Sequence, residues 1–442
     1  MTIQISDHFT YRKLIRFTIP SIIMMIFTSI YGVVDGIFVS NFVGKTPFAA
    51  INLIWPVAMI LGAVGFMIGT GGCALVSKIM GEGEKEKANE VFSMLIYVSA
   101  VIGIVLAILG FIFMRPIAIL LGAEGDMVDD AAMYGRVLSI ALPFFLLQNE
   151  FQSFLVAAEK HKIGLLITVA AGLTNIALDA FFIIVLNKDL VGAAWATAIS
   201  QMVGGFIPLM YFIFSKKSTL RLGKARFDGR ALIKTCVNGS SEMMTNISMS
   251  LVSMLYNFQL LKMAGENGVA AYGVIMYVNF IFVAAFIGYS VGSSPIVSFN
   301  YGAGNTKELK SLFRKSMMII LVAGIVMTIL GFILASTLSQ IFVGYDKELF
   351  EMTKRAFYIY TLSFLITGFN IYGSAFFTAL NDGLVSAIIS FLRTLLFQVV
   401  AVMVLPIFFE LDGIWYAVIM AELLALVVTV GFLVTKKSKY QY

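Results

Sequence analysis

Two aspartates stand inside apolar segments, where a charged side chain is costly. Asp35 interrupts "VVDGIFVSNFVG" and Asp179 interrupts "TNIALDAFFIIVL". An acid within a membrane span usually faces a partner or a water-filled cavity. Burial and a like-charged neighbour both favour its protonated form, so a pair of such carboxyl groups can gain and lose a proton near neutral pH. The alternative role is structural, with a hydrogen-bonded aspartate holding two helices together.

The two aspartates lie at similar depths. At a helical rise of ~1.5 Å per residue, Asp35 lies about 28 Å from Arg16, and Asp179 lies about 26 Å from Lys162. Both basic residues mark the cytoplasmic ends of their spans. We therefore expect the two carboxyl groups in the outer half of the membrane and in the same half of the chain, where they could meet.

A second group of charged side chains is expected nearer the cytoplasm, roughly 12–15 Å inside the membrane at helical rise. It comprises Glu150, Glu242 and Arg393. The two glutamates belong to different halves of the chain and could face each other across a cleft, with Arg393 as counter-charge. Structural pairing and direct handling of substrate or protons are both open. Glu422 is a lone acid near the middle of a span, without an assigned role.

The residues after Glu242 form a candidate cleft wall in "SEMMTNISMSLVSMLYNF". Methionine adapts its shape to a ligand, and aromatic faces attract cations. This wall supplies the substrate candidates Met243, Met244, Asn246 and Tyr256.

Long apolar segments must position these groups. The chain has 442 residues, of which 60% are hydrophobic and 13% charged, and its mean hydropathy is +0.93. About 20 apolar residues span a bilayer as a helix. The sequence therefore predicts an all-α integral membrane protein with twelve transmembrane helices, at 14–40, 48–78, 91–114, 133–157, 163–186, 190–214, 232–261, 269–299, 314–340, 356–380, 384–408 and 413–435.

Basic residues predict the orientation. Twelve spans put both termini on one side, and that side holds 22 of the 31 lysines and arginines. Because positive charge marks the cytoplasm, we expect a multi-pass protein of the cell membrane with both termini cytoplasmic. The net charge of +6 then reflects topology and not nucleic-acid binding. With two histidines and two distant cysteines, we expect neither a metal site nor a disulfide.

The chain repeats itself at an offset of 221 residues. The segments "VIGIVLAILGFI" (101–112) and "VAGIVMTILGFI" (322–333) match at nine of twelve positions. We predict two six-helix lobes, 1–215 and 232–442, joined by a basic cytoplasmic linker, 216–231. Six spans per lobe insert both lobes the same way up, so their pseudo-two-fold axis runs along the membrane normal, as in many transporters.

Four segments resemble signatures of the MATE exporters, the multidrug and toxic compound extrusion family. They are "VVDGIFVSNFVG" (33–44), "GTGGCALVSKIMGEGEKEKA" (69–88), "NIALDAFFI" (175–183) and "PIVSFNYGAGN" (295–305). The resemblance covers essentially the whole chain and is closest to the bacterial branch of MepA-like and DinF-like exporters. It implies a V-shaped pair of helical bundles that exports cationic amphiphiles in exchange for protons or sodium ions.

The resemblance also implies roles for individual residues. Asp35 and Asp179 match the family's aspartates of the first and fifth helices, and Pro20 matches a position associated with bending of the first helix. Tyr31, Asn175 and Thr197 fall where similar proteins place polar partners of the aspartate pair. Tyr31 and Asn175 each precede an aspartate by four residues and so share its helix face. Sodium-type members carry a carboxylate in the tenth span; "LSFLITGFNIYGSAFFTAL" has none, which argues against a second-lobe cation site of that kind.

The sequence leaves three functional hypotheses. The first is a secondary exporter, working as a monomer among membrane lipids without a cofactor other than its coupling ion, H⁺ or, as the second choice, Na⁺. The second is a flippase for a lipid-linked or amphiphilic metabolite; such a protein would be expected to have a strongly cationic cavity, whereas the spans here hold five acids and Arg393. The third is a membrane enzyme or a channel. An enzyme would need a constellation of His, Asp and Glu at a membrane face, so we expect no enzyme.

Overall fold

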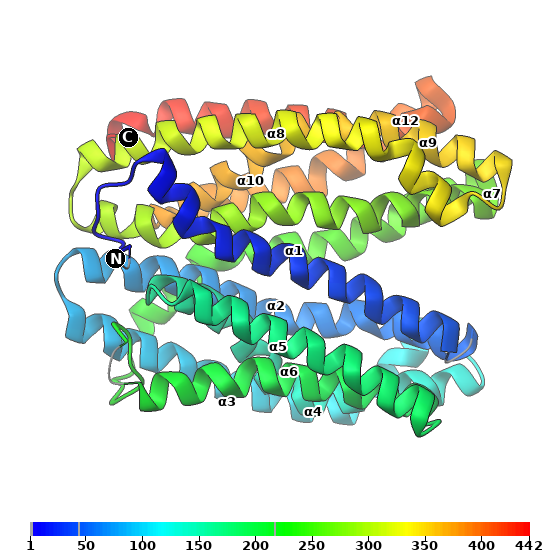
Figure 1. Ribbon diagram of the computed structural model, residues 1–442, viewed down its shortest axis with the longest axis horizontal. Coiled ribbons are helices and arrows are strands. Elements are labelled where there is room, and N and C mark those ends of the chain that lie inside the picture. The colour runs from blue at the N-terminus through cyan, green and yellow to red at the C-terminus, as the bar shows by residue number, and fades with distance from the viewer. Residues whose placement is uncertain (1–2, 43–44, 216–217) are drawn as a thin grey trace.

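The protein is an all-helical bundle whose long helices run side by side in two groups (Figure 1). The computed structural model describes residues 3–42, 45–215 and 218–442. Four residues of the segments analysed above lie outside this range: Val43 and Gly44 of the first motif, and Lys216 and Lys217 of the predicted linker. The described part of the first half holds α1 (Tyr11–Phe42), α2 (Lys45–Gly81), α3 (Lys85–Leu120), α4 (Asp126–Ala157), α5 (His161–Asp179), the π-helix η1 (Ala180–Val185) and α6 (Asp189–Phe214).

The second half has the same plan but longer continuous helices. It holds α7 (Gly229–Gly302), α8 (Thr306–Val343), α9 (Lys347–Thr361), α10 (Phe364–Ala379), α11 (Gly383–Phe391), the π-helix η2 (Leu392–Leu396), α12 (Phe397–Thr435) and the short α13 (Lys437–Tyr440). Within the described residues, nine helices are long and apolar enough to cross a membrane, and the bent pair α9–α10 makes a tenth.

Two of these long helices each contain two crossings. In α7, Gly265 adopts φ 61° and ψ −151°, a conformation that glycine tolerates and a helix does not. Near the start of α7, Gly239 packs against Gly71 of α2, and near its end Phe299 packs against Gly81 of α2. These two α2 residues are only ten positions apart. Both ends of α7 therefore lie at the same end of the molecule, so the chain reverses at Gly265.

The run from α11 to α12 reverses in the same way at Glu410, which has φ 51° and ψ −133°. A Cβ atom on Gly413 would lie 2.5 Å from Leu405 O across this turn. At the other end, the Tyr440 hydroxyl donates to Asp382 Oδ2 at 2.6 Å, which places the two ends of the hairpin together. With both hairpins resolved, the described helices provide the twelve crossings predicted from the apolar runs.

The fifth, tenth and eleventh spans differ from the continuous helices expected. The tenth is broken at Leu362–Ser363, where α9 and α10 meet at an angle of 50°. The fifth changes from α- to π-helix directly after Asp179. The eleventh changes in the same way at Leu392, beside Arg393. A π-helical turn inside an α-helix often lies at a functional site.

The repeat of 221 residues reappears as reciprocal contacts between the halves. A Cβ atom on Gly81 would lie 2.0 Å from Phe299 O, and a Cβ atom on Gly302 would lie 2.1 Å from Lys78 O. Subtracting 221 from Phe299 and Gly302 gives Lys78 and Gly81, so these two contacts are one contact seen from both sides. This reciprocity requires a two-fold relation between α2 and the second part of α7.

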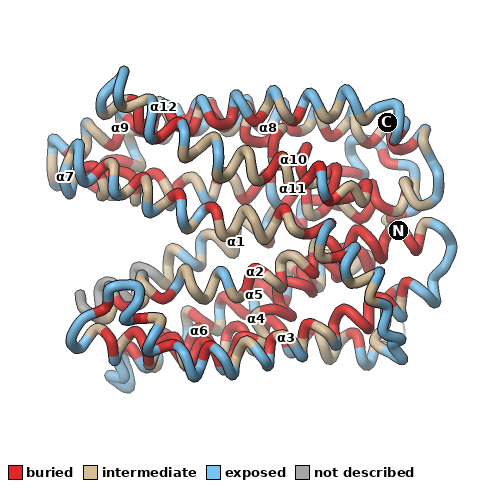
Figure 2. Tube along the Cα trace, turned by 180° about the vertical axis from the view of Figure 1, so that it is seen from behind, coloured by how far each residue is buried: buried red, intermediate tan, exposed pale blue. Residues whose placement is uncertain are grey.

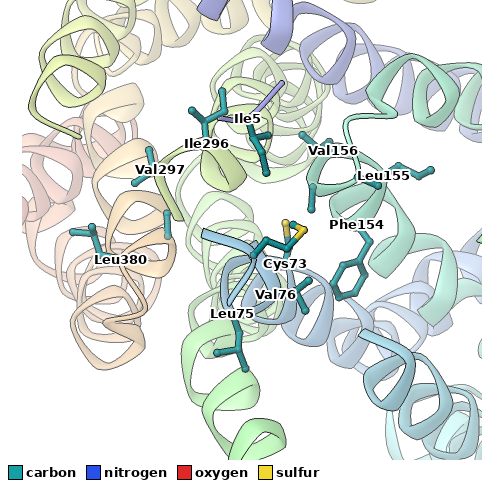
Figure 3. Close-up of a cluster of buried hydrophobic side chains, with 14 of the residues drawn as sticks. Ile5, Cys73, Leu75, Val76, Phe154, Leu155, Val156, Ile296, Val297 and Leu380 are labelled. Carbon is teal, nitrogen blue, oxygen red and sulfur yellow. The ribbon is translucent and has the colours of Figure 1, made fainter. Parts of the chain in front are cut away.

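The halves pack together at the end that carries both termini (Figure 2). One apolar core crosses this junction, which we call the seam: Cys73, Val76 and Phe154 of the first half share it with Ile296 and Leu380 of the second (Figure 3). Two further cores lie within single halves, one around Tyr134 of α4 and one around Trp415 of α12. The helices are thus held in two lobes that share one buried seam.

Candidate functional site

The fold brings the two intramembrane aspartates together. Asp35 lies on α1, and Asp179 is the last residue of α5 and is fully buried. Their side chains are close enough to share a hydrogen bond. Two ionised carboxylates can only accept hydrogen bonds, and in that state no donor reaches either oxygen of Asp179. A direct hydrogen bond between them therefore requires one proton on the pair.

Close helix packing permits this meeting. Gly172 of α5 faces α1, and a Cβ atom there would lie 2.6 Å from Phe27 Cε1 and 3.1 Å from Tyr31 Cδ1. A small residue at such a position lets two helices approach within the membrane. Asp179 then follows Gly172 by two helical turns on the same side of α5, and η1 begins at the next residue.

Polar side chains surround the pair as the sequence indicated. Asn175 is buried and lies within hydrogen-bonding reach of Asp35, and its Oδ1 has no donor. Tyr31 is close enough to Asp35 to interact with its charge. Thr197 of α6 is buried and lies within hydrogen-bonding reach of the Tyr134 hydroxyl.

Tyr134 of α4 is the site residue that sequence reasoning missed. Its side chain is 2% exposed and lies close enough to both aspartates to interact electrostatically. No spacing rule could have found it, because α4 is separated along the chain from α1 and from the end of α5.

Glu150 does not face Glu242 across a cleft, contrary to the expectation. It is fully buried in α4, and its backbone packs against α2, where a Cβ atom on Gly69 would lie 2.9 Å from Glu150 Cα. Ser99 of α3 is its polar neighbour. Even so, neither the Ser99 hydroxyl nor either Glu150 oxygen makes a hydrogen bond of normal geometry. The packing of α4 thus directs the Glu150 side chain into the interior of the first lobe.

Arg393 is not the counter-charge of Glu150. Its Nε donates to Glu422 Oε1 at 2.9 Å and Oε2 at 3.1 Å, and its Nη2 lies 2.9 Å from Oε1. Asn370 Nδ2 donates to the other side of the same carboxylate, to Oε2 at 2.7 Å. Glu422, which the sequence left without a role, is therefore half of a buried ion pair between η2 and α12.

Glu242 and the predicted cleft wall lie on α7. Glu242, Met243, Met244 and Asn246 are all half-buried, and Asn246 donates to the backbone carbonyl of Glu242 at 2.8 Å. Tyr256 is buried instead, with its hydroxyl donating to Gln398 Oε1 of α12 at 2.8 Å. The wall is thus accessible near Glu242 and closed at Tyr256.

The α1 helix contacts both lobes on either side of Pro20. On the terminal side, Thr18 packs against Gly292 of α7, where a Cβ atom would lie 3.2 Å from Thr18 Cα. On the other side, Phe27 and Tyr31 contact α5. Proline leaves one carbonyl without its helical donor, so α1 is locally weakened at Pro20. Contacts with α7 continue beyond this point, where Ser29 donates to the carbonyl oxygen of Phe280 at 3.3 Å.

Comparison with known proteins gives one consistent result. The sequence matches the MatE family over residues 20–181 and again over 243–404. The Multidrug export protein MepA of Staphylococcus saprophyticus is 24% identical over 408 residues, covering 92% of this chain and 88% of that protein. MepA of Staphylococcus aureus is 24% identical over 413 residues, covering 93% and 91%.

Solved structures show the same fold. A crystal structure of MATE in complex with MaL6 superposes with a TM-score of 0.93 at 22% identity, covering 98% of each chain. The outward-facing conformation of a multidrug resistance MATE family transporter superposes with a TM-score of 0.92 at 23% identity, covering 98% of this chain and 97% of that one. The two family matches fall in the two halves of this chain and include both aspartates. The chain therefore belongs to the MatE family of membrane transporters, as its motifs indicated.

Proposed function

We propose that this protein is a secondary active exporter of cationic amphiphilic compounds, driven by proton uptake at Asp35 and Asp179. The contact between these two carboxyl groups, buried within one lobe, is the observation that carries the proposal. The similarity to proteins named for multidrug export supports the choice of substrate.

A proton suits the pair better than Na⁺. Two carboxyl groups that share a hydrogen bond need one proton between them, whereas a bound ion must come between them and separate them. Sodium is the second choice, because the unpartnered oxygens of Asp35, Asp179 and Asn175 are the kind of ligand that hard cations prefer.

Proton binding can be converted into movement through α1. Protonation removes a negative charge from the contact between α1 and α5, and so changes how strongly the outer part of α1 holds to the first lobe. The terminal part of α1 stays packed on α7 at Thr18. We propose that α1 bends near Pro20 between these two parts, expels the bound cation, and resets when the pair loses its proton to the cytoplasm.

The proposed setting is the cell membrane, with both termini in the cytoplasm. The positive-inside distribution of 22 of the 31 basic residues supports it. Transport would then start from the half-buried residues around Glu242 and end outside the cell.

The test is ethidium transport in proteoliposomes under a proton gradient and, separately, under a sodium gradient. We expect movement only with the proton gradient, and its loss in Asp179→Asn. Movement only with sodium would replace the proton by Na⁺ at the same residues. Absence of movement under both gradients would refute cation export and favour the hypothesis of a lipid-linked substrate.

A further inference from the structure

The second lobe contains a cluster of charged side chains within its membrane spans that the proton mechanism does not use. It consists of Glu242 on α7, Arg393 in η2 and Glu422 on α12, which we call the charge triad. Arg393 and Glu422 form a side-on ion pair with side-chain exposures of 15% and 5%. A buried ion pair stabilises a protein poorly compared with apolar packing, so its presence within a membrane span suggests a functional role.

Both carboxylate oxygens of Glu422 accept hydrogen bonds within this cluster. Besides accepting from Arg393, its Oε2 accepts from Asn370 Nδ2 at 2.7 Å, and Asn370 Oδ1 accepts in turn from the Thr429 hydroxyl at 3.1 Å. The carboxylate is thus held by donors from η2 and α10, and its negative charge is neutralised by the guanidinium.

Glu242 is the second acid of the triad and is not part of the Arg393–Glu422 ion pair. The helix that carries it, α7, packs against η2, and Arg393 lies close enough to Glu242 to interact with its charge. A helical side chain also leans toward the N-terminus of its helix. Arg393 therefore leans toward the beginning of α11, where Gly383 packs against Asn238, one turn before Glu242. One guanidinium serves two carboxylates, so the ionised triad has a net charge of one negative unit.

We propose that this net charge determines which organic cations the transporter binds, with one positive charge preferred. A monocation would pair with Glu242 while Arg393 remains on Glu422. A dication would bring one positive charge more than the triad can neutralise, next to a guanidinium in a poorly solvated site. The proposal rests on the cation-export function above and adds its charge selectivity.

Two phenanthridinium dyes provide matched probes, because ethidium carries one positive charge and propidium carries two. Equilibrium binding to purified protein, followed by dye fluorescence, gives the ratio of the two affinities. If the proposal is right, this ratio depends on the sum of the three side-chain charges and not on the identity of any one residue.

The expected pattern is as follows. Glu422→Gln frees Arg393 to neutralise Glu242, so ethidium affinity should fall at least about tenfold, or about 1.4 kcal/mol, as it should in Glu242→Gln. The double variant Arg393→Gln/Glu422→Gln restores one net negative charge and should recover ethidium binding to within a few-fold of the wild type. Arg393→Lys should keep the wild-type preference, because it keeps the charge.

An ion pair at the surface of the same lobe provides the control. Arg355 and Asp412 pair with side-chain exposures of 70% and 25%, and Arg355→Gln/Asp412→Asn should leave the ratio unchanged. If the double triad variant stays as defective as Glu422→Gln although it elutes as a folded monodisperse protein, the ion pair is structural and the proposal is wrong. If the wild type binds neither dye, the export function itself fails.

Discussion

The close crossing of α2 and α7 predicts a large effect from a single methyl group. A Cβ atom on Gly239 would lie 1.8 Å from Met67 O and 2.7 Å from the carbon that bears it, whereas ordinary contact begins at 3.4 Å. Both neighbours are backbone atoms, so no side-chain rotation can relieve the clash. In Gly239→Ala the two lobes must therefore separate along the seam.

The magnitude follows from two opposing terms. Overfilling a packed interface costs about 1–3 kcal/mol, and replacing glycine by alanine within a helix returns about 1 kcal/mol. The net loss in the stability of the closed seam is therefore expected to reach about 2 kcal/mol. Gly273 lies on the same helix, and a Cβ atom added there would have no neighbouring atom within 4 Å. Gly273→Ala is therefore the matched control and should be neutral or slightly stabilised.

A cysteine at the seam can report the change. Cys73 is buried, with its Sγ 3.4 Å from the carbonyl oxygen of Ser153, and it is a free thiol. With the half-buried Cys236 replaced by serine, the rate of Cys73 labelling by a water-soluble maleimide measures how often the seam opens. An increase of about tenfold corresponds to about 1.4 kcal/mol. Equal labelling rates in Gly239→Ala and Gly273→Ala would refute the packing argument.

Three further predictions concern the polar residues. Asp179→Asn should abolish the proton release that accompanies ethidium addition while the protein stays folded; retained proton release would rule out the aspartate pair as the coupling site. Tyr134→Phe removes the hydroxyl that lies within hydrogen-bonding reach of Thr197 and should lower the transport rate severalfold while leaving proton binding intact, as measured in proteoliposomes. Burial raises the pKa of Glu159 above its ordinary value of 4.5, although the backbone N–H of Ile5 donates to it at 2.8 Å. Its protonated form is therefore favoured while the N-terminal segment is packed against it. The stability that this packing contributes is lost as the pH rises through the raised pKa. Limited proteolysis of the N-terminal segment should accelerate with pH above about 4.5 in the wild type; an equal acceleration in the permanently neutral Glu159→Gln would contradict this assignment.

The apolar runs were sufficient to predict the twelve crossings, because hydrocarbon forces each span to satisfy its backbone hydrogen bonds within a helix. They could not show the π-helical turns after Asp179 and at Arg393, or the bend at Leu362–Ser363. Those irregularities depend on how neighbouring helices satisfy the freed carbonyl and amide groups. Local sequence does not contain that information.

The sequence predicted one charge contact and misassigned another. Equal depth and a common lobe were enough to bring Asp35 and Asp179 together. The same depth argument paired Glu150 with Glu242, which is wrong, because depth fixes the height of a side chain and not the direction in which it points. Glu150 turns toward Ser99, and Arg393 takes Glu422.

By itself, then, the sequence determined the membrane spans, their two-fold repeat and the presence of an acidic pair within one half. These properties follow from composition and spacing along single helices. Only the tertiary structure decided that Tyr134 joins the pair and that Arg393 belongs to Glu422. Which face of one helix meets which face of another is set by the simultaneous packing of all twelve crossings, and glycines such as Gly172 and Gly239 determine how closely those faces approach.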